Sequence, residues 1–185
     1  MQKPQLFMVL LGCTPPGRLT EQHDIFFGIA NSLKELLPQM LAFWPEANGK
    51  IHIDAWRTVN KVGSYKVEVL AKGRAKPCEN ALFFINLGGY KPGEFDEPHY
   101  KMLTVASQKA LAIKEAKETA FYKHTGFEGA VSHIDDKYGV DVDDVFEIED
   151  ILSAETKAKY ALQIFTATNF PDDEINLGYL PLAKI

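Results

Sequence analysis

Cysteine and long hydrophobic runs are scarce in this sequence, and acidic residues outnumber basic ones. The chain has only two cysteines, Cys13 and Cys78, which argues against the disulfide framework of a small secreted domain. Reduced thiols in a cytoplasmic protein are therefore expected. No apolar stretch approaches the roughly 18 residues of a membrane-spanning helix. The net charge of −5, without a run of Lys and Arg, argues against nucleic acid as a partner.

The rest of the composition is typical of a globular protein. Hydrophobic residues make up 46% of the chain and charged residues 24%, and this balance is too apolar for a disordered protein. The length of 185 residues allows one domain or two small domains packed together.

An internal repeat organises the chain. When the sequence is shifted by 76 residues, LFMVLLGCTPPGRLTEQH (6–23) aligns with LFFINLGGYKPGEFDEPH (82–99), and eight of the 18 positions are identical. About one identity is expected by chance at typical residue frequencies. The apolar pattern continues beyond the aligned segment, which indicates a duplication.

The first 13 residues, MQKPQLFMVLLGC, allow two interpretations. They match a bacterial lipoprotein signal in which Cys13 carries the lipid, and they also match the first strand of a cytoplasmic domain. Because their counterpart at 82–88 lies in the middle of the chain, we expect folded structure rather than a cleaved leader. Buried strands are therefore expected at 6–11 and 82–87.

The first unit has the pattern ββαββ. Its helical stretch, 31–44, has apolar residues at 3.6-residue spacing, with Ser32 and Glu35 placed as a capping box. Pro38 is expected to kink this helix. The predicted strands are 6–11, 23–30, 50–59 and 65–71, with a turn at 60–64.

The second unit repeats this order after a polar linker at 72–80. We expect a helix over 107–124 and a last strand over 160–167. The third strand has two candidates: residues 133–135 match His52–Asp54 in their letters, whereas 144–152 has the better strand pattern. The tail, 171–182, has no counterpart in the first unit.

These patterns predict an α+β fold made of two tandem ββαββ repeats, 1–78 and 79–185, the second with the C-terminal tail. Each repeat alone would bury a marginal core. We therefore expect their antiparallel sheets to pack as a pseudo-twofold pair within one compact globular unit.

The motif Leu-Gly-x-x-x-Pro-Gly-x-(Leu/Phe)-x-Glu-x-His occurs in both units, at 11–23 and 87–99. It resembles the bacterial domain-of-unknown-function family 1543 (DUF1543), whose members carry one or two copies of such a unit. The resemblance extends from Leu6 to about Leu180 and is closer in the second copy, because Cys13 and Thr14 stand in the first where the second has Gly89 and Tyr90. It implies two tandem copies and no particular activity.

The duplicated Glu-x-His pairs are the candidate catalytic residues. Glu21 and His23, like Glu97 and His99, point to the same side of an extended chain, and a carboxylate beside an imidazole can orient it as a base or as a metal ligand. His52 with Asp54, and His133 with Asp135, could join such a site. The alternative is structural: each Glu accepts backbone hydrogen bonds of the loop and each His packs at a strand start.

The glycine-rich loops between the first two strands of each unit are further candidates for ligand binding. Both match Gly-x-x-x-x-Gly, but no Lys-Ser or Lys-Thr follows, so nucleotide binding is rejected. Their glycines are expected to permit a positive φ. The candidate ligand-binding residues are Gly12, Pro16, Gly17, Gly88, Tyr90, Pro92, Gly93, His52 and His133.

Metal-site and nucleophile motifs have little support. There is no His-Glu-x-x-His and no paired cysteine ligands, and the acidic stretch 135–150 lacks the order of a calcium loop. Cys13 follows a strand as a nucleophile could, but its counterpart is Gly89 and no partner His is identified. No metal or cofactor is expected.

We therefore expect a binding or structural module for a small ligand or a protein partner. The alternative is a metal-assisted or acid–base hydrolase that uses the Glu-x-His pairs. No nucleic-acid or membrane partner is expected. Exposed strand edges could pair between chains, so a homo-oligomer stays open.

Overall fold

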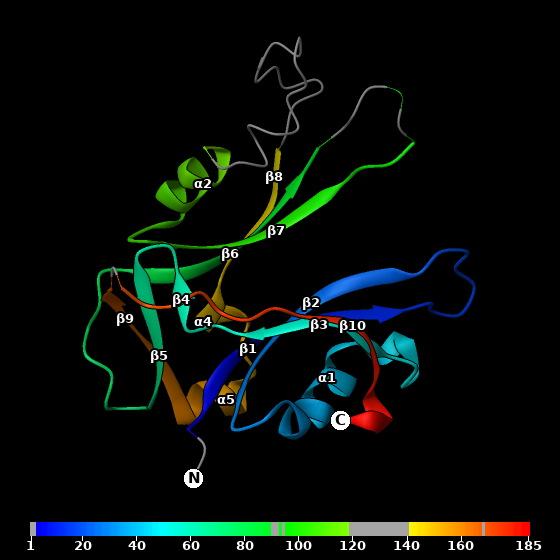
Figure 1. The fold of residues 1–185 in the computed structure, drawn as a ribbon, viewed down its shortest axis with the longest axis horizontal. Helices are drawn as coiled ribbons and strands as arrows, with labels where there is room; N and C mark the ends of the chain where they lie inside the picture. The colour runs from blue at the N-terminus through cyan, green and yellow to red at the C-terminus, as the bar shows by residue number, and fades with distance from the viewer. Residues whose placement is uncertain (1–2, 90–92, 94, 119–140, 168) are drawn as a thin grey trace. The chain divides into compact units, whose positions relative to one another are not determined.

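The computed structural model describes residues 3–89, 93, 95–118, 141–167 and 169–185. The chain divides into two compact units (Figure 1). Unit 1 comprises Met1–Pro77 and Leu152–Ile185, and unit 2 comprises Cys78–Ile151. The segment from Leu152, which belongs to the second predicted repeat (79–185), thus packs in unit 1. The expectation of a single globular unit stays a prediction.

The main sheet of unit 1 has four antiparallel strands in the order β10-β3-β1-β2. The inner strand β1 is predominantly apolar and is hydrogen-bonded to β2 on one side and to β3 on the other. Helix α1 covers one face (Figure 1), where Leu36 and Met40 pack on alternate residues of β1, such as Val9 and Leu11. The strands are β1 (Gln5–Cys13), β2 (Gln22–Ala30), β3 (His52–Thr58) and β10 (Asn176–Pro181).

The helix predicted over 31–44 is two shorter pieces, the 3-10 helix η1 (Leu33–Leu36) and α1 (Leu37–Phe43). Pro38 lies in the first turn of α1, where the missing N–H costs no helical hydrogen bond. It therefore starts α1 and does not kink a longer helix. The expected capping box is also wrong: Ser32 makes no cap bond, and Glu35 Oε2 instead accepts from the backbone N–H of Asn31 at 3.0 Å. A second 3-10 helix, η2 (Pro45–Ala47), follows.

A second sheet in unit 1 brings distant parts of the sequence together. It has the order β4-β5-β9, from β4 (Lys61–Val62), β5 (Tyr65–Ala71) and β9 (Tyr160–Thr166). The strand expected at 160–167 therefore exists, but it pairs with β5 of unit 1. Helix α5 (Ala154–Lys159) directly precedes β9. Ser153 is its N-cap residue, because the Ser153 Oγ accepts a hydrogen bond from the Thr156 backbone N–H.

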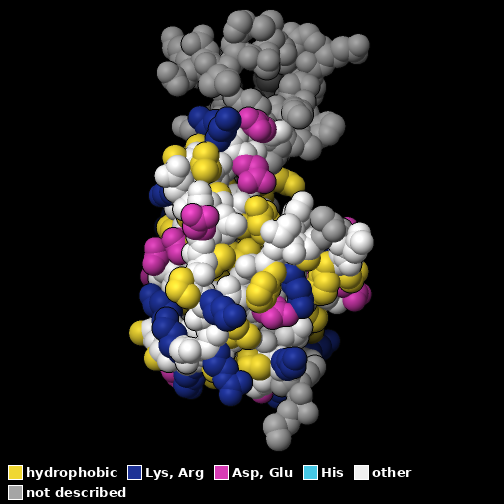
Figure 2. Space-filling view, turned by 90° about the vertical axis from the view of Figure 1, so that its left-hand side faces the viewer, with side chains coloured by type: hydrophobic (Ala, Val, Ile, Leu, Met, Phe, Trp, Pro, Cys, Tyr) yellow, Lys and Arg dark blue, Asp and Glu magenta, His cyan; other side chains and the backbone are white. Residues whose placement is uncertain are grey.

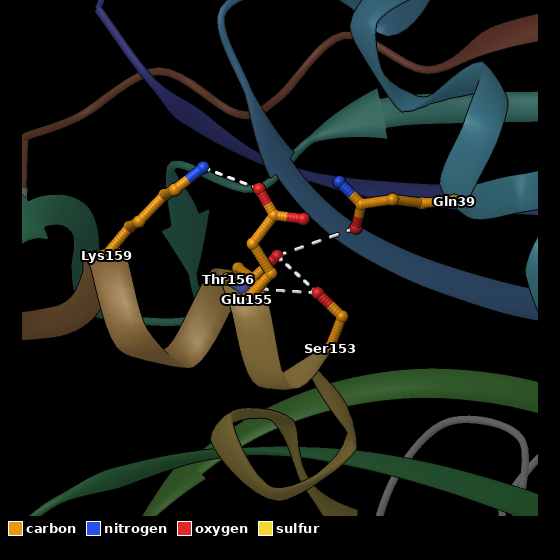
Figure 3. Close-up of polar contacts among 5 residues, drawn as sticks. All are labelled: Gln39, Ser153, Glu155, Thr156 and Lys159. Carbon is orange, nitrogen blue, oxygen red and sulfur yellow. Dashed lines mark hydrogen bonds and ion pairs between the residues drawn. The ribbon is translucent and has the colours of Figure 1, made fainter.

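Helix α5 lies in the C-terminal segment that packs in unit 1, and it contacts residues from the first half of the sequence. Figure 3 shows Thr156 between Ser153 and Gln39, with Thr156 Oγ1 3.5 Å from Gln39 Oε1. On the exposed side of α5, Lys159 pairs with Glu155 one turn earlier at 2.6 Å. The last element is the 3-10 helix η3 (Leu182–Lys184).

Unit 2 has a three-stranded antiparallel sheet in the order β7-β6-β8 with α2 on one face (Figure 1). Its elements are β6 (Ala81–Gly88), β7 (His99–Ala106), α2 (Lys109–Lys117), β8 (Asp141–Glu147) and α4 (Ile148–Ile151). The strand expected at 144–152 thus starts earlier and ends where α4 begins. The helix expected over 107–124 lies only partly within the described residues.

The two units share a strand pattern. Gly12 lies opposite His23 and His52, and Gly88 lies opposite His99 and Asp141. The register shifts once in each, between Leu10 and Leu11 and between Asn86 and Leu87. The residue in the position of His52 is thus Asp141 and not His133, which lies outside the described residues.

The antiparallel sheets with helices confirm the α+β class. The packing of the two repeats as a pseudo-twofold pair stays a prediction. Each helix in the described part of the chain is too short or too polar to span a membrane.

The helical layer of unit 1 can be tested at Leu36, which is fully buried. Leu36→Ala should lower the free energy of unfolding by about 2–5 kcal/mol, because it leaves a cavity under the sheet. Leu41→Ala, at a side chain that is 43% exposed, is the matched control and should change stability by less than about 1 kcal/mol. Urea unfolding followed by circular dichroism measures both; equal losses would contradict this packing.

Unit 2 should be more stable in mild acid because of Glu147. Burial, together with the charges of Asp150 and Glu149, raises the pKa of this carboxyl. A raised folded-state pKa favours folding at low pH, and this contribution is lost as the pH rises through that pKa. Glu147→Gln should therefore raise the melting temperature at about pH 7 and have less effect at about pH 4, where the wild-type carboxyl is protonated. A melting temperature lowered at neutral pH would contradict this account.

Candidate ligand site at the end of the first sheet

Three neighbouring strands align His23, Gly12 and His52 in one row across the sheet. Gly12 has no side chain, and the space above it is filled by its neighbours. A Cβ atom at Gly12 would lie 2.3 Å from Asp54 Oδ2 and 2.4 Å from His52 Nε2. Glycine at this position therefore leaves room for the Asp54 and His52 side chains, and it does not have the positive φ that the loop pattern predicted.

A register shift in β3 brings Asp54 to the same place. Leu10 pairs with Ala55, but Leu11 pairs with Ile53, so Asp54 is the extra residue of a β-bulge. A bulge redirects side chains relative to the regular alternation of a strand. As a result Asp54 stands beside His52 above Gly12.

Glu21, His23, His52 and Asp54 form a closed cluster, the histidine–carboxylate quartet. His23 Nε2 lies 3.2 Å from Asp54 Oδ2 and 3.7 Å from Glu21 Oε2. His52 Nε2 lies 3.2 Å from Glu21 Oε1 and 3.3 Å from Asp54 Oδ2. Each carboxylate thus contacts both imidazoles.

The quartet has a buried side and an open side. The side chain of His52 is 9% exposed, whereas those of His23 and Glu21 are 38% and 45% exposed. On the buried side, His52 Nε2 and Asp54 Oδ2 have no hydrogen-bond partner. They are close enough for electrostatic contact, but their geometry is not that of a hydrogen bond. A buried polar atom without a partner is costly and is typical of a site that awaits another group.

The C-terminal tail completes the site with an aromatic ring. Tyr179 of β10 packs against His52, with 4.4 Å between the ring centroids and 39° between the ring planes. The β10–β3 register is irregular between Leu177 and Leu180, and Gly178 has a φ of 125°, so the backbone around Tyr179 departs from a regular ladder. The sequence analysis missed Tyr179, because nothing in the tail signals that it pairs with a strand over 100 residues earlier.

Cys13 is buried at the end of β1 beside this site. Burial raises the pKa of its thiol, the charge of Glu21 raises it further, and Lys50 opposes the shift. A buried thiol with a raised pKa is a weak nucleophile.

The loop residues of the first unit do not join the quartet in any described contact. Gly17 has a φ of 80°, as its pattern predicted, and lies in a turn in which the Arg18 N–H donates to the Pro15 carbonyl at 3.1 Å. Pro16 is exposed on this turn.

The second-copy candidates belong to unit 2. His99 lies opposite Gly88, as His23 lies opposite Gly12, and Gly93 has a φ of 84°. The Glu97 backbone N–H donates to Asp96 Oδ1 at 2.8 Å. Tyr90, Pro92, His133 and Asp135 lie outside the described residues.

Within the described residues, no group of three or more His, Cys, Asp and Glu side chains is arranged to hold a metal ion. The quartet is instead an alternating arrangement of two imidazoles and two carboxylates. It can accept hydrogen bonds from a donor group, and its imidazoles can carry a proton.

Comparison with known proteins supports the family resemblance in part. Residues 18–69 match the family model described as Domain of Unknown Function (DUF1543). The match spans all four residues of the quartet and falls in the first copy, whereas the motif resemblance was closer in the second. None of the curated proteins matches the chain.

One solved structure has a similar fold over nearly the whole chain. It is described as the crystal structure of a protein Il1583 from Idiomarina loihiensis. The TM-score is 0.66 at 21% identity, and the alignment covers 97% of this chain and 99% of the other. At this identity the likeness concerns the fold.

The position of Cys13 predicts a difference in thiol reactivity. At about pH 8, iodoacetamide should label the exposed Cys78 quickly and Cys13 slowly, because only the thiolate reacts and Cys13 is buried with a raised pKa. Glu21→Gln should shift the pH midpoint of Cys13 labelling downward, because it removes a charge that raises this pKa. Mass spectrometry of labelled peptides measures both rates. An unchanged or higher midpoint would be the contrary result, and Glu97→Gln is the control.

Proposed function

We propose that unit 1 is a binding module whose histidine–carboxylate quartet holds a small ligand. The observation that carries this proposal is the pair of buried atoms without hydrogen-bond partners, His52 Nε2 and Asp54 Oδ2. Such atoms cost stability unless a partner satisfies them. The side chains of His23 and Glu21, which contact these two atoms, are exposed to solvent.

The chemistry of the quartet favours a ligand with a primary ammonium group. Two carboxylates supply acceptors only, and an unprotonated imidazole nitrogen is also an acceptor. An ammonium group has three donors and a positive charge, and charge-assisted hydrogen bonds are the stronger kind. Tyr179, which packs against His52 and is itself exposed, adds an aromatic face to which a cation is attracted.

Nuclear magnetic resonance of the full chain, labelled at histidine, tests this proposal with ethylammonium chloride as the probe. We expect saturable shifts of the His23 and His52 imidazole signals, and no such shifts with sodium propionate or propanol. Asp54→Asn should weaken the binding about tenfold, the loss expected for one charge-assisted hydrogen bond. Its melting temperature should stay within a few degrees of the wild type.

The matched control is the corresponding glutamate of the second copy. Glu21→Gln should weaken ethylammonium binding, whereas Glu97→Gln should leave it unchanged. Equal effects of the two variants, or the absence of saturable shifts, would overturn the proposal. Unfolding of Glu21→Gln and Asp54→Asn without any ligand effect would support the structural alternative.

The second candidate is a metal-assisted or acid–base hydrolase. Each imidazole Nε2 lies within 3.2–3.3 Å of a carboxylate oxygen, a distance at which a carboxylate can orient a general base. Hydrolysis of p-nitrophenyl acetate that is lost in His23→Ala would favour it. About one equivalent of a transition metal in the purified protein, lost in His23→Ala and His99→Ala together, would favour its metal-assisted form.

We also propose that the chain is a tandem duplication, with repeats at 1–78 and 79–185. The shared register at Gly12 and Gly88, and the shared bulge one strand away, support it. The pairing of β5 with β9 adds support. These are the last predicted strands of the two repeats, and corresponding strands can meet at a twofold axis between related units.

A bacterial, cytoplasmic setting and the absence of nucleic-acid or membrane partners are part of the proposal. The sequence supports it with two cysteines and a net charge of −5. On the face seen in Figure 2, Lys and Arg side chains are interspersed with acidic and apolar ones, unlike the continuous basic face that nucleic acid selects.

A further inference from the structure

A hollow in unit 1 lies at the opposite end of the main sheet from the quartet, along β1 and β3. Its volume is about 330 Å³, within the range of about 300–1,000 Å³ that is usual for small-molecule sites. It opens where η1 begins and α1 no longer covers the strands. Phe7, Leu33 and Trp56 line its apolar part.

Trp56 supplies a flat surface in this hollow. Its ring is half-buried and packs against Phe7, with 6.1 Å between the ring centroids. An aromatic ring held in place by a neighbour offers a large apolar face at little entropic cost. The hollow therefore suits a ligand that also has a flat or ring-shaped apolar side.

The rim of the hollow is polar and largely neutral. Gln5, Ser32 and Asn176 line it, and no side-chain hydrogen bond joins these residues to any other described residue. Ser32 stands at the N-cap of η1 but makes no cap bond. Amides and hydroxyls both donate and accept, so the rim offers both kinds of group. Glu174 is the one charged side chain among the residues that line it.

Unit 2 has a hollow at the corresponding place with different chemistry. Its volume is about 250 Å³, and Phe83 occupies the position of Phe7, 76 residues earlier. The position of Trp56, opposite Val9 on β1, is taken by Val145, opposite Ile85 on β6. Lys109, Glu147 and Asp150 line the unit 2 hollow. The backbone frame thus recurs. Phe83 and Phe146 line the unit 2 hollow, whereas the indole and the largely neutral rim belong to unit 1.

We propose that the Trp56 hollow binds a neutral, hydroxyl-rich ring, of which a monosaccharide is the representative. Hydroxyl groups donate and accept at once and so suit a rim of amides and hydroxyls. The C–H face of such a ring packs on the indole of Trp56, and its neutrality fits a lining with a single carboxylate. This site is separate from the quartet and does not depend on the function proposed for it.

The experiment is a titration of the full chain with four neutral sugars, D-glucose, D-galactose, D-mannose and D-ribose, followed by the indole N–H signals in ¹H–¹⁵N spectra. Trp44→Phe assigns the two tryptophan signals. We expect at least one sugar to shift the Trp56 signal in a saturable way and to leave the Trp44 signal in place. Cyclohexanol, a ring with one hydroxyl, and sodium gluconate, a charged open chain, are the matched controls and should bind at least tenfold more weakly.

Variants separate binding from folding. Trp56→Val, which introduces the residue found at the unit 2 position, should weaken sugar binding at least tenfold. Trp56→Phe keeps an aromatic face and should retain most of it, followed by the signals of Ser32 and Asn176. Ser32→Ala and Asn176→Ala should each weaken binding severalfold, whereas Val145→Ala in unit 2 should have no effect.

Several results would overturn the proposal. They are no saturable shift with any of the four sugars, equal binding of cyclohexanol, or equal loss in Trp56→Val and Val145→Ala. Asp54→Asn should leave sugar binding unchanged. The two proposals can therefore be tested independently. Absence of ethylammonium binding alone would contradict the proposal for the quartet, and absence of sugar binding alone would contradict the proposal for the hollow.

Discussion

The pairing of β1 with β2 on one side and β3 on the other is the constraint on which unit 1 depends. One register brings His23, Gly12 and His52 into a row, and one bulge turns Asp54 toward them. The same ladders set the alternate side chains of β1 against α1. A shift of the β1 pairing register by one residue would move every side chain of β1 to the other face of the sheet. Both the quartet and the packing of the core would then be lost.

Unit 2 has the same strand pairing around β6, but different residues occupy the corresponding positions. Asp141 lies opposite Gly88 where His52 lies opposite Gly12, and Val145 replaces the aromatic surface of Trp56. Backbone geometry is set by strand pairing, which tolerates many side chains, whereas a ligand site depends on particular groups at particular distances. The two units therefore resemble each other more in fold than in the chemistry they offer, as expected when function lies in sites carried by a fold.

Short-range patterns in the sequence predicted several individual strands well. Strands β1 and β6 form at the predicted buried apolar runs, β2 at a run of aromatic and β-branched residues, and β5 where polar and apolar residues alternate. Glu21, His23, His52 and Asp54 were all singled out from the sequence. It failed where the outcome depended on partners distant in the chain. Ser32 was expected to cap a long helix, but Pro38 starts a new one. The tail was set aside, although β10 pairs with β3 and brings Tyr179 onto His52.

By itself, the sequence determined the strands of the first unit and the first two strands of the second, since apolar runs, alternation and turn residues act over a few positions. It also singled out candidate acid–base side chains, Glu21, His23, His52 and Asp54 among them. Only the tertiary structure decided that His52 and Asp54 meet Glu21 and His23, that β9 joins β5, and that Gly12 leaves room for the quartet. These outcomes follow from strand register, a β-bulge and long-range strand pairing. Their stability depends on the whole fold, so no short stretch of sequence predicts them.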